Sequence, residues 1–354
     1  MIEQEIMSLI IPPIPPFDEK AAEAAQARQA SLTKPLGSLG KLERLAVRLA
    51  GMTGKVRPRF EKKAHIIMAA DHGIAEEGVS AYPQEVTPQM VLNFLSGGAA
   101  VNIFARMAKA ALTVVDIGVA YDFGGVEGLL DRKIAMGTQN MLHGPAMNRE
   151  QAEQSIQIGM DVANDLIDSG AQLLGIGEVG IGNTTPSATI IAMLSGKPVA
   201  EVTSRGTGLD DPGLAHKIKV IEAVIERHKD DCGDPIAMLA NVGGFELGGM
   251  AGVVLAAASR RVPVVVDGYI AGAAALIAIG LAPEAQKYLI ASHESAEPGA
   301  EICTQLLGLE ALFDLNFRLG EGTGSVLAFQ LVEAAARIQD EMATFDEAGV
   351  DEKL

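Results

Sequence analysis

The feature that most constrains this fold is a series of short, continuous apolar runs separated by helical patterns. The runs are residues 64–70, 112–117, 172–176, 263–267 and 288–291. A strand that is apolar on both faces is typical of a parallel sheet with helices on both sides. The sequence therefore predicts an α/β fold built on a buried parallel sheet.

The helical patterns lie between and around these runs. We expect helices at residues 18–28, 41–49, 87–108, 149–169, 186–194, 213–228, 248–259, 271–279, 299–307 and 325–339. Residues 11–16, Ile-Pro-Pro-Ile-Pro-Pro, should form an extended arm, because proline cannot continue a helix. The first 60 residues read as a small helical unit, and the acidic tail 344–354 is expected to fray.

Charge and cysteine content exclude several classes of protein. A net charge of −17 argues against nucleic acid or an anionic membrane as partner. The two cysteines, Cys232 and Cys303, lie far apart, and the six histidines are scattered, so we expect no disulfide framework and no metal. Residues 1–5 lack the basic start of a signal peptide, and charges interrupt the apolar runs after residue 247. We expect a cytoplasmic protein.

Glycine and polar residues gather where the predicted strands end. In a parallel α/β sheet, ligands bind beyond the carboxyl ends of the strands. These clusters are residues 71–73, 116–118, 177–185, 267–269 and 292–295. The sequence thus predicts one ligand site at that edge of the sheet.

The cluster at 175–185 allows more than one interpretation. Gly175 to Gly180 matches the G-x-G-x-x-G pattern of dinucleotide folds, and Glu201 follows at a suitable distance. However, the next helix is expected to start near Thr184, with Asn183 or Thr184 as its N-cap, whereas the dinucleotide fingerprint itself opens the helix. Residues 182–185 could instead cradle a phosphate or ribose at a helix N-terminus. A structural loop, an anion site and an NAD site all remain open.

A lone carboxylate, Glu321, lies in the glycine-framed turn 318–324 before an apolar helix. Partly shielded there, it could accept a proton near neutral pH. Asp71-His72-Gly73 is better explained as a structural loop than as a metal site, since no second histidine has ligand spacing. Residues 242–250 are expected to pack a helix tightly on the sheet. His216, Lys217 and Lys219 could each meet a phosphate, although such charges usually mark a solvated face.

Seven motifs, in one order, resemble a known family. They are residues 34–40 (Lys-Pro-Leu-Gly-Ser-Leu-Gly), 70–73, 177–186, 242–247, 266–269, 292–297 and 318–324. The chain resembles the nicotinate-nucleotide–dimethylbenzimidazole phosphoribosyltransferases from about residue 30 to about residue 340. The resemblance implies transfer of the 5-phosphoribosyl group of nicotinate mononucleotide to 5,6-dimethylbenzimidazole or a related base, giving α-ribazole 5′-phosphate and nicotinate for cobalamin synthesis.

The resemblance also implies an architecture. It suggests a Rossmann-like doubly wound parallel sheet with a small helical domain, and a homodimer. The helical domain would comprise residues 1–60 plus about 330–354, and the catalytic domain residues 61–329. No cofactor or metal is implied, because the nicotinate ring leaves as a neutral pyridine.

Site residues follow from the family's motifs, position by position. Glu321 would be the catalytic base. The nucleotide side would comprise Glu178, Val179, Gly180, Asn183, Thr184 and Lys217, and the base side Val79, Tyr82, Met90, Ser295 and Leu319. At Tyr82 and Met90 the chain departs from a Ser and a Gln in other members, so another benzimidazole, a purine or a phenol could be preferred. An NAD-dependent oxidoreductase and a non-catalytic nucleotide-binding module are the alternatives.

Overall fold

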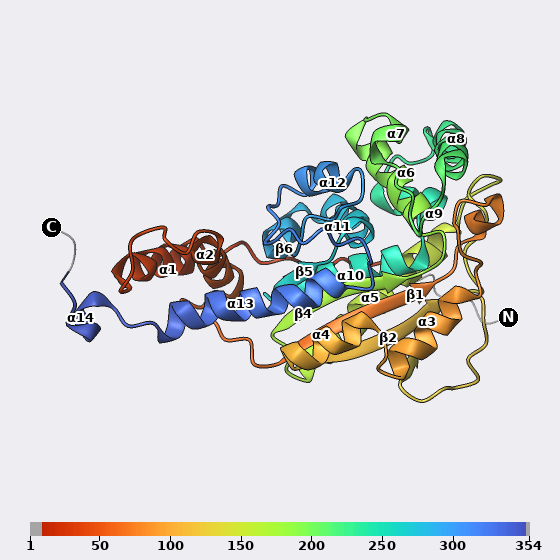
Figure 1. The fold of residues 1–354 in the computed structure, drawn as a ribbon. Coiled ribbons are helices and arrows are strands. Elements are labelled where there is room, and N and C mark those ends of the chain that lie inside the picture. The colour runs from red at the N-terminus through yellow and green to blue at the C-terminus, as the bar shows by residue number, and fades with distance from the viewer. Residues whose placement is uncertain (1–8, 352–354) are drawn as a thin grey trace.

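A parallel β-sheet lies at the centre of the molecule (Figure 1). The computed structural model describes residues 9–351. Within them the strand order is β3-β2-β1-β4-β5-β6, and every neighbouring pair is parallel. The order reverses between β1 and β4, which is the doubly wound arrangement. The strands are β1 (Lys63–Ala70), β2 (Ala110–Gly118), β3 (Leu129–Asp131), β4 (Leu173–Val179), β5 (Val264–Val266) and β6 (Leu289–Ala291).

Helices cover the sheet on both faces, so the predicted α/β class is confirmed (Figure 1). They are α3 (Val86–Leu95), α4 (Ala100–Ala108), α5 (Arg149–Asp168), α6 (Thr184–Ser195), α7 (Val199–Val202), α8 (Asp211–His228), α9 (Pro235–Val242), α10 (Phe245–Ser259), α11 (Tyr269–Leu281) and α12 (Ala300–Leu306), with 3₁₀ turns η1 (Gly73–Glu77) and η2 (Pro283–Tyr288). Strand β3 and the helices α7 and α9 were not expected from the sequence.

Tight packing of α10 explains the glycines of residues 242–250. A side-chain carbon at Gly248 would lie 1.8 Å from Ser155 Oγ of α5, and one at Gly249 would lie 3.0 Å from Ile117 of β2. The helix is therefore wedged between α5 and the sheet, and only glycine allows so close an approach. The predicted tight packing is present, with α5 as well as with the sheet.

The single helix expected at residues 87–108 is wrong, because the chain breaks after Leu95. Gly97 adopts a left-handed φ of 78°, and the Asn102 side chain accepts from Ala99 N at 3.1 Å while donating to Phe94 O at 2.9 Å. Two helices, α3 and α4, result. By length and composition alone Val86–Ala108 could cross a membrane, yet this break divides it.

Helices from the N-terminal and C-terminal parts of the chain lie together at one side of the molecule. Helices α1 (Glu19–Ser31), α2 (Lys41–Thr53) and α14 (Phe345–Ala348) lie beyond the sheet, and the long helix α13 (Thr323–Glu341) extends out to them (Figure 1). Gln29 Nε2 donates to Gln339 Oε1 at 2.7 Å, which joins α1 to α13. The tail is more ordered than expected, since Thr344 caps α14; residues 352–354 lie outside the described part.

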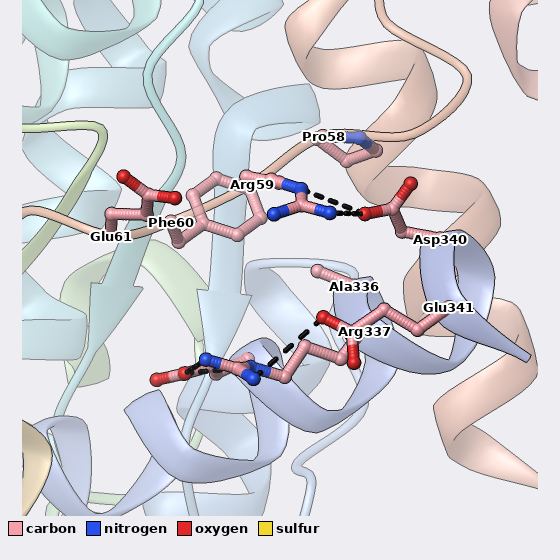
Figure 2. A pocket seen from close by; sticks show the side chains of 9 residues that line it. Pro58, Arg59, Phe60, Glu61, Ala336, Arg337, Asp340 and Glu341 are labelled. Atoms are coloured by element: carbon pink, nitrogen blue, oxygen red, sulfur yellow. Dashed lines mark hydrogen bonds and ion pairs between the residues drawn. The ribbon is translucent and has the colours of Figure 1, made fainter.

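Charged side chains fasten α13 to the segment leading into β1 (Figure 2). Arg59 Nε donates to Asp340 Oδ2 at 2.7 Å, and Arg337 pairs with Glu333 at 2.9 Å. Lys63, the first residue of β1, also pairs with Glu333, at 2.7 Å. A small pocket of about 70 Å³ is lined by Arg59, Glu333, Arg337 and Asp340 among others. The pocket lies at the junction between α13 and the segment that leads into β1.

Candidate active site

A cavity of about 560 Å³ opens beyond the carboxyl ends of β4, β5 and β6. This is where ligands bind in doubly wound sheets. Loops after these three strands supply most of its wall, and α3 and the turn before α13 complete it. The lining residues are Tyr82, Val86, Met90, Glu178, Val179, Gly180, Ile181, Asn183, Thr184, Gly206, Thr207, Asp267, Gly268, Tyr269, Ile270, Ala271, His293, Ser295, Glu297, Arg318, Leu319, Gly320 and Glu321.

Glu321 sits in the cavity wall on an unusual backbone. Its φ is 63°, between Gly320 at 79° and Gly322 at 82°, so three successive residues are left-handed. Residues other than glycine rarely adopt this conformation, and it is found preferentially at functional sites. The main chain is held there because Glu321 O lies 3.3 Å from His65 Nε2. The turn therefore fixes the position of one carboxylate facing the cavity.

Three carboxylates lie in this wall, and the pKa of each is raised. Burial raises the pKa of Glu178 to about 8. Burial, and then the charge of Asp267, raise the pKa of Glu321 to about 7. Burial also raises the pKa of Asp267 to about 7, although backbone N–H groups oppose the shift. Groups with such values can accept or hold a proton near neutral pH.

Asp267 is a site residue that was missing from the predicted set. Its carboxylate accepts from Ser325 N at 3.0 Å and from Gly322 N at 3.2 Å, so it caps the start of α13. It thereby ties the end of β5 to the turn that carries Glu321. The sequence signal was an aspartate closing the apolar run Val264–Val266, a typical strand-end position for a functional side chain.

The glycine pattern of residues 175–180 has a different purpose from a dinucleotide fingerprint. Strand β4 continues to Val179, so Gly175 and Gly177 lie inside it, and α6 starts only at Thr184. A side-chain carbon at Gly177 would lie 2.6 Å from Glu321 O. The glycine thus lets the Glu321 turn rest directly on the strand. This geometry argues against the NAD interpretation.

Asn183 occupies the N-cap position of α6 but does not cap with its side chain. Its amide Nδ2 instead makes a short hydrogen bond to Glu178 Oε2. The predicted N-cap position is therefore correct, but the Asn183 side chain bonds the Glu178 carboxylate instead of the start of α6. Glu178 Oε1 accepts from Glu321 N at 3.4 Å, so Glu178 connects β4, α6 and the turn that carries Glu321.

Lys217 lies behind the cavity wall and not in it. The side chain is fully buried, and its Nζ donates to Thr184 Oγ1 at 2.6 Å. Burial lowers the pKa of Lys217 to about 8, while Glu297 opposes the shift. Lys217 therefore contacts the cavity wall through the hydroxyl group of Thr184. Of the two other basic residues on α8, His216 bonds Glu77 O and Lys219 is exposed.

The residues expected on the base side divide into two groups. Tyr82, Met90, Ser295 and Leu319 all line the cavity. Val79 does not, because it is buried in the core beneath the loop, at 1% exposure. The loop itself is fastened across the cavity mouth by Thr207 Oγ1, which lies 3.3 Å from both Ser80 Oγ and Ala81 N.

A buried ion pair lies beneath the Gly180 turn of the cavity wall. His72 Nε2 lies 2.9 Å from Glu246 Oε1, and both side chains are excluded from solvent. A side-chain carbon at Gly180 would lie 3.5 Å from the His72 ring. The pair therefore fills the space under the Gly180 turn. Asp71 and Asp116, also at strand ends, accept from backbone N–H groups and do not line the cavity.

Comparisons with known proteins identify the class. A family model described as phosphoribosyltransferase matches residues 14–350. The chain is therefore a phosphoribosyltransferase, a pentosyltransferase whose cavity lies beyond the carboxyl ends of β4, β5 and β6.

The particular family follows from close relatives. The nicotinate-nucleotide–dimethylbenzimidazole phosphoribosyltransferase of Chloroflexus aggregans is 56% identical over 348 residues, which is 98% of this chain and 99% of that one. The enzyme of the same name from Roseiflexus sp. is 56% identical over 349 residues, 99% of each. A crystal structure of that enzyme from Thermus thermophilus superposes with a TM-score of 0.89 at 45% identity, covering 95% of this chain and 100% of that chain. The chain belongs to the nicotinate-nucleotide–dimethylbenzimidazole phosphoribosyltransferase family.

Proposed function

We propose that the chain transfers the 5-phosphoribosyl group of nicotinate mononucleotide to 5,6-dimethylbenzimidazole or a related base, in cobalamin nucleotide-loop synthesis. The observation that carries the proposal is Glu321, a half-shielded carboxylate on a left-handed turn, with its pKa raised to about 7 by burial. Family membership over nearly the whole chain supports the same reaction.

The chemistry needs one proton acceptor. A lone pair on the benzimidazole nitrogen attacks C1′ of the ribose, and the bond from C1′ to the nicotinate nitrogen breaks. That electron pair returns to the pyridine ring, which leaves neutral at its nitrogen. The proton on the other benzimidazole nitrogen passes to Glu321. No further reactant is consumed.

Positive charge develops on the ribose while the old bond breaks and the new one forms. Carboxylates fixed near C1′ would stabilise such an oxocarbenium-like state. We assign this role to Asp267, which hydrogen bonds from Gly322 N and Ser325 N hold in the cavity wall beside the Glu321 turn.

The nucleotide phosphate is proposed to bind at the start of α6, near Gly180 to Thr184. Backbone N–H groups at a helix N-terminus favour an anion. Lys217 supports the site by donating to Thr184 Oγ1. Val179 and Asn183 complete the wall on this side.

The base is proposed to lie against Tyr82, Met90 and Leu319, with Ser295 also contributing to its wall. A flat neutral base gains about 25 cal/mol per Å² of apolar area removed from water. Tyr82 is 54% exposed and free to cover the base with its ring. Tyr82→Ser combined with Met90→Gln should change the ranking of alternative bases in competition assays and leave nicotinate mononucleotide binding nearly unchanged. An unaltered ranking would assign selectivity elsewhere.

We further propose a cytoplasmic homodimer whose small helical domain comprises residues 1–60 plus about 330–354. Ile103 and Met107 support self-association: they lie one turn apart on α4 and are 48% and 62% exposed. Sedimentation analysis would test the assembly.

One experiment tests the proposed reaction. The protein is incubated with nicotinate mononucleotide and a panel of bases, and products are identified by mass. We expect a ribosylated base 5′-phosphate and free nicotinate. Binding without any product would instead support a non-catalytic nucleotide-binding module.

A further inference from the structure

The charges that line the cavity do not match those of its proposed donor. Nicotinate mononucleotide carries a phosphate and a ring carboxylate, both anionic. The lining contains four carboxylates, those of Glu178, Asp267, Glu297 and Glu321. Those that are ionised would repel an anionic ligand in a partly water-excluded site. The anionic groups of the donor should therefore bind next to the cations in the wall.

Among the lining residues of the described chain, Arg318 is the only lysine or arginine. Lys217 lies behind the wall and donates to Thr184. His293 does not compensate, because burial lowers its pKa to about 4 and leaves it neutral at pH 7. Arg318 thus supplies the one permanent positive charge among these lining residues, beside four carboxyl groups.

The main chain around Arg318 is held on both sides of the residue. On one side, Phe317 O accepts from Ala296 N at 2.9 Å. On the other, a side-chain carbon at Gly320 would lie 2.6 Å from Glu178 Oε1, so the turn is pressed against β4. None of the ion pairs found within residues 9–351 includes Arg318. The N–H groups of its guanidinium are therefore free to bind a ligand.

We propose that Arg318 binds the carboxylate of the nicotinate ring and thereby makes the enzyme select nicotinate mononucleotide over the uncharged nicotinamide mononucleotide. The inference rests on the proposed function. The phosphate has donors of its own at the start of α6, which leaves the ring carboxylate for Arg318. A planar guanidinium matches a carboxylate with two parallel hydrogen bonds.

Direct binding measurements test this assignment without turnover. Dissociation constants for nicotinate mononucleotide and nicotinamide mononucleotide are measured by calorimetry, with no base present, for the wild type, Arg318→Gln and Arg318→Lys. Loss of a charged hydrogen-bonded pair should weaken nicotinate mononucleotide binding by about tenfold to a hundredfold in Arg318→Gln. Binding of nicotinamide mononucleotide should change by less than about threefold. Arg318→Lys keeps the charge without the fork and should fall between.

Arg205→Gln is the matched control. Arg205 precedes the lining residue Gly206, and its guanidinium pairs with Asp211. The control removes the same unit charge beside the same cavity, so the ratio of the two dissociation constants should stay at the wild-type value. An equal change of that ratio in Arg205→Gln would mean that the effect of Arg318→Gln arises from net charge alone. This result would overturn the proposal.

Other outcomes also overturn it. Equal weakening of both nucleotides by Arg318→Gln would mean that Arg318 holds the phosphate. Unchanged binding of both, or a wild type that does not discriminate between them, would remove the basis for selection. If discrimination is lost as expected but the wild type transfers no phosphoribosyl group to any base, the proposed reaction fails while the binding assignment stands.

Discussion

At the scale of single residues, the site depends on carboxylates that the fold keeps partly protonated. Glu321 is held on a left-handed turn, and Asp267 lies close enough to raise its pKa. Two interacting groups with similar values titrate as a pair, so their apparent pKa values belong to both. The proposed base is therefore only partly ionised at neutral pH.

The rate should depend on pH through this pair. Glu321 must be ionised to accept the proton, and its pKa is raised to about 7 by burial. We expect kcat to rise up to about pH 7 and to fall about tenfold for each unit below that value. A pH profile with saturating substrates measures this. A rate that is constant from pH 5 to pH 8 would contradict a base with this environment.

At the scale of elements, the His72–Glu246 pair joins the end of β1 to α10 beneath the nucleotide turn. Burial alone would lower the pKa of His72, but the Glu246 carboxylate more than offsets this, so the pKa is raised. A raised histidine pKa contributes stability that is complete below pH 6.5 and is lost as the pH rises through the folded value.

Glu246→Gln should destabilise the protein at pH 6 by about 3–5 kcal/mol, because it leaves the imidazolium of His72 buried without its partner. Denaturant unfolding measures the change. The matched control is Glu226→Gln, which removes the partner of exposed Lys229 and should cost less than about 1 kcal/mol. A loss for Glu246→Gln no larger than that of the control would show that His72 and Glu246 do not form an ionised pair.

Element patterns were predicted better than the details that join them. Period and composition located the buried strands because each run is apolar on both faces. They did not reveal the break after Leu95, which depends on the Asn102 side chain. Nor did they place Lys217 behind Thr184, or Val79 in the core, since these depend on contacts between distant segments. The pair of His72 with Glu246 was missed for the same reason, whereas the strand-end position of Asp267 was visible in the sequence and only its contact with the Glu321 turn was not.

At the scale of the whole molecule, the cavity is a place where function opposes stability. Burial raises the pKa of Glu178 to about 8, so its charged form is disfavoured by the fold. An acid with a raised pKa destabilises the folded state as the pH rises from its unfolded pKa to its folded pKa. The complete fold around the sheet must offset this cost.

Glu178→Gln should therefore stabilise the ligand-free protein at alkaline pH. At pH 8 we expect Tm to rise by about a few degrees, and near pH 4 the two proteins should unfold at about the same temperature. Scanning calorimetry at both pH values measures the difference. Equal or lower stability of the variant at pH 8 would mean that the carboxylate is not strained by burial.

The most direct test of the central claim is single-turnover product formation by Glu321→Gln. With nicotinate mononucleotide and 5,6-dimethylbenzimidazole, we expect the wild type to form α-ribazole 5′-phosphate. The variant should bind both substrates with nearly unchanged dissociation constants and form product at least about a hundredfold more slowly. A variant that binds normally and reacts at a near wild-type rate would contradict Glu321 as the base.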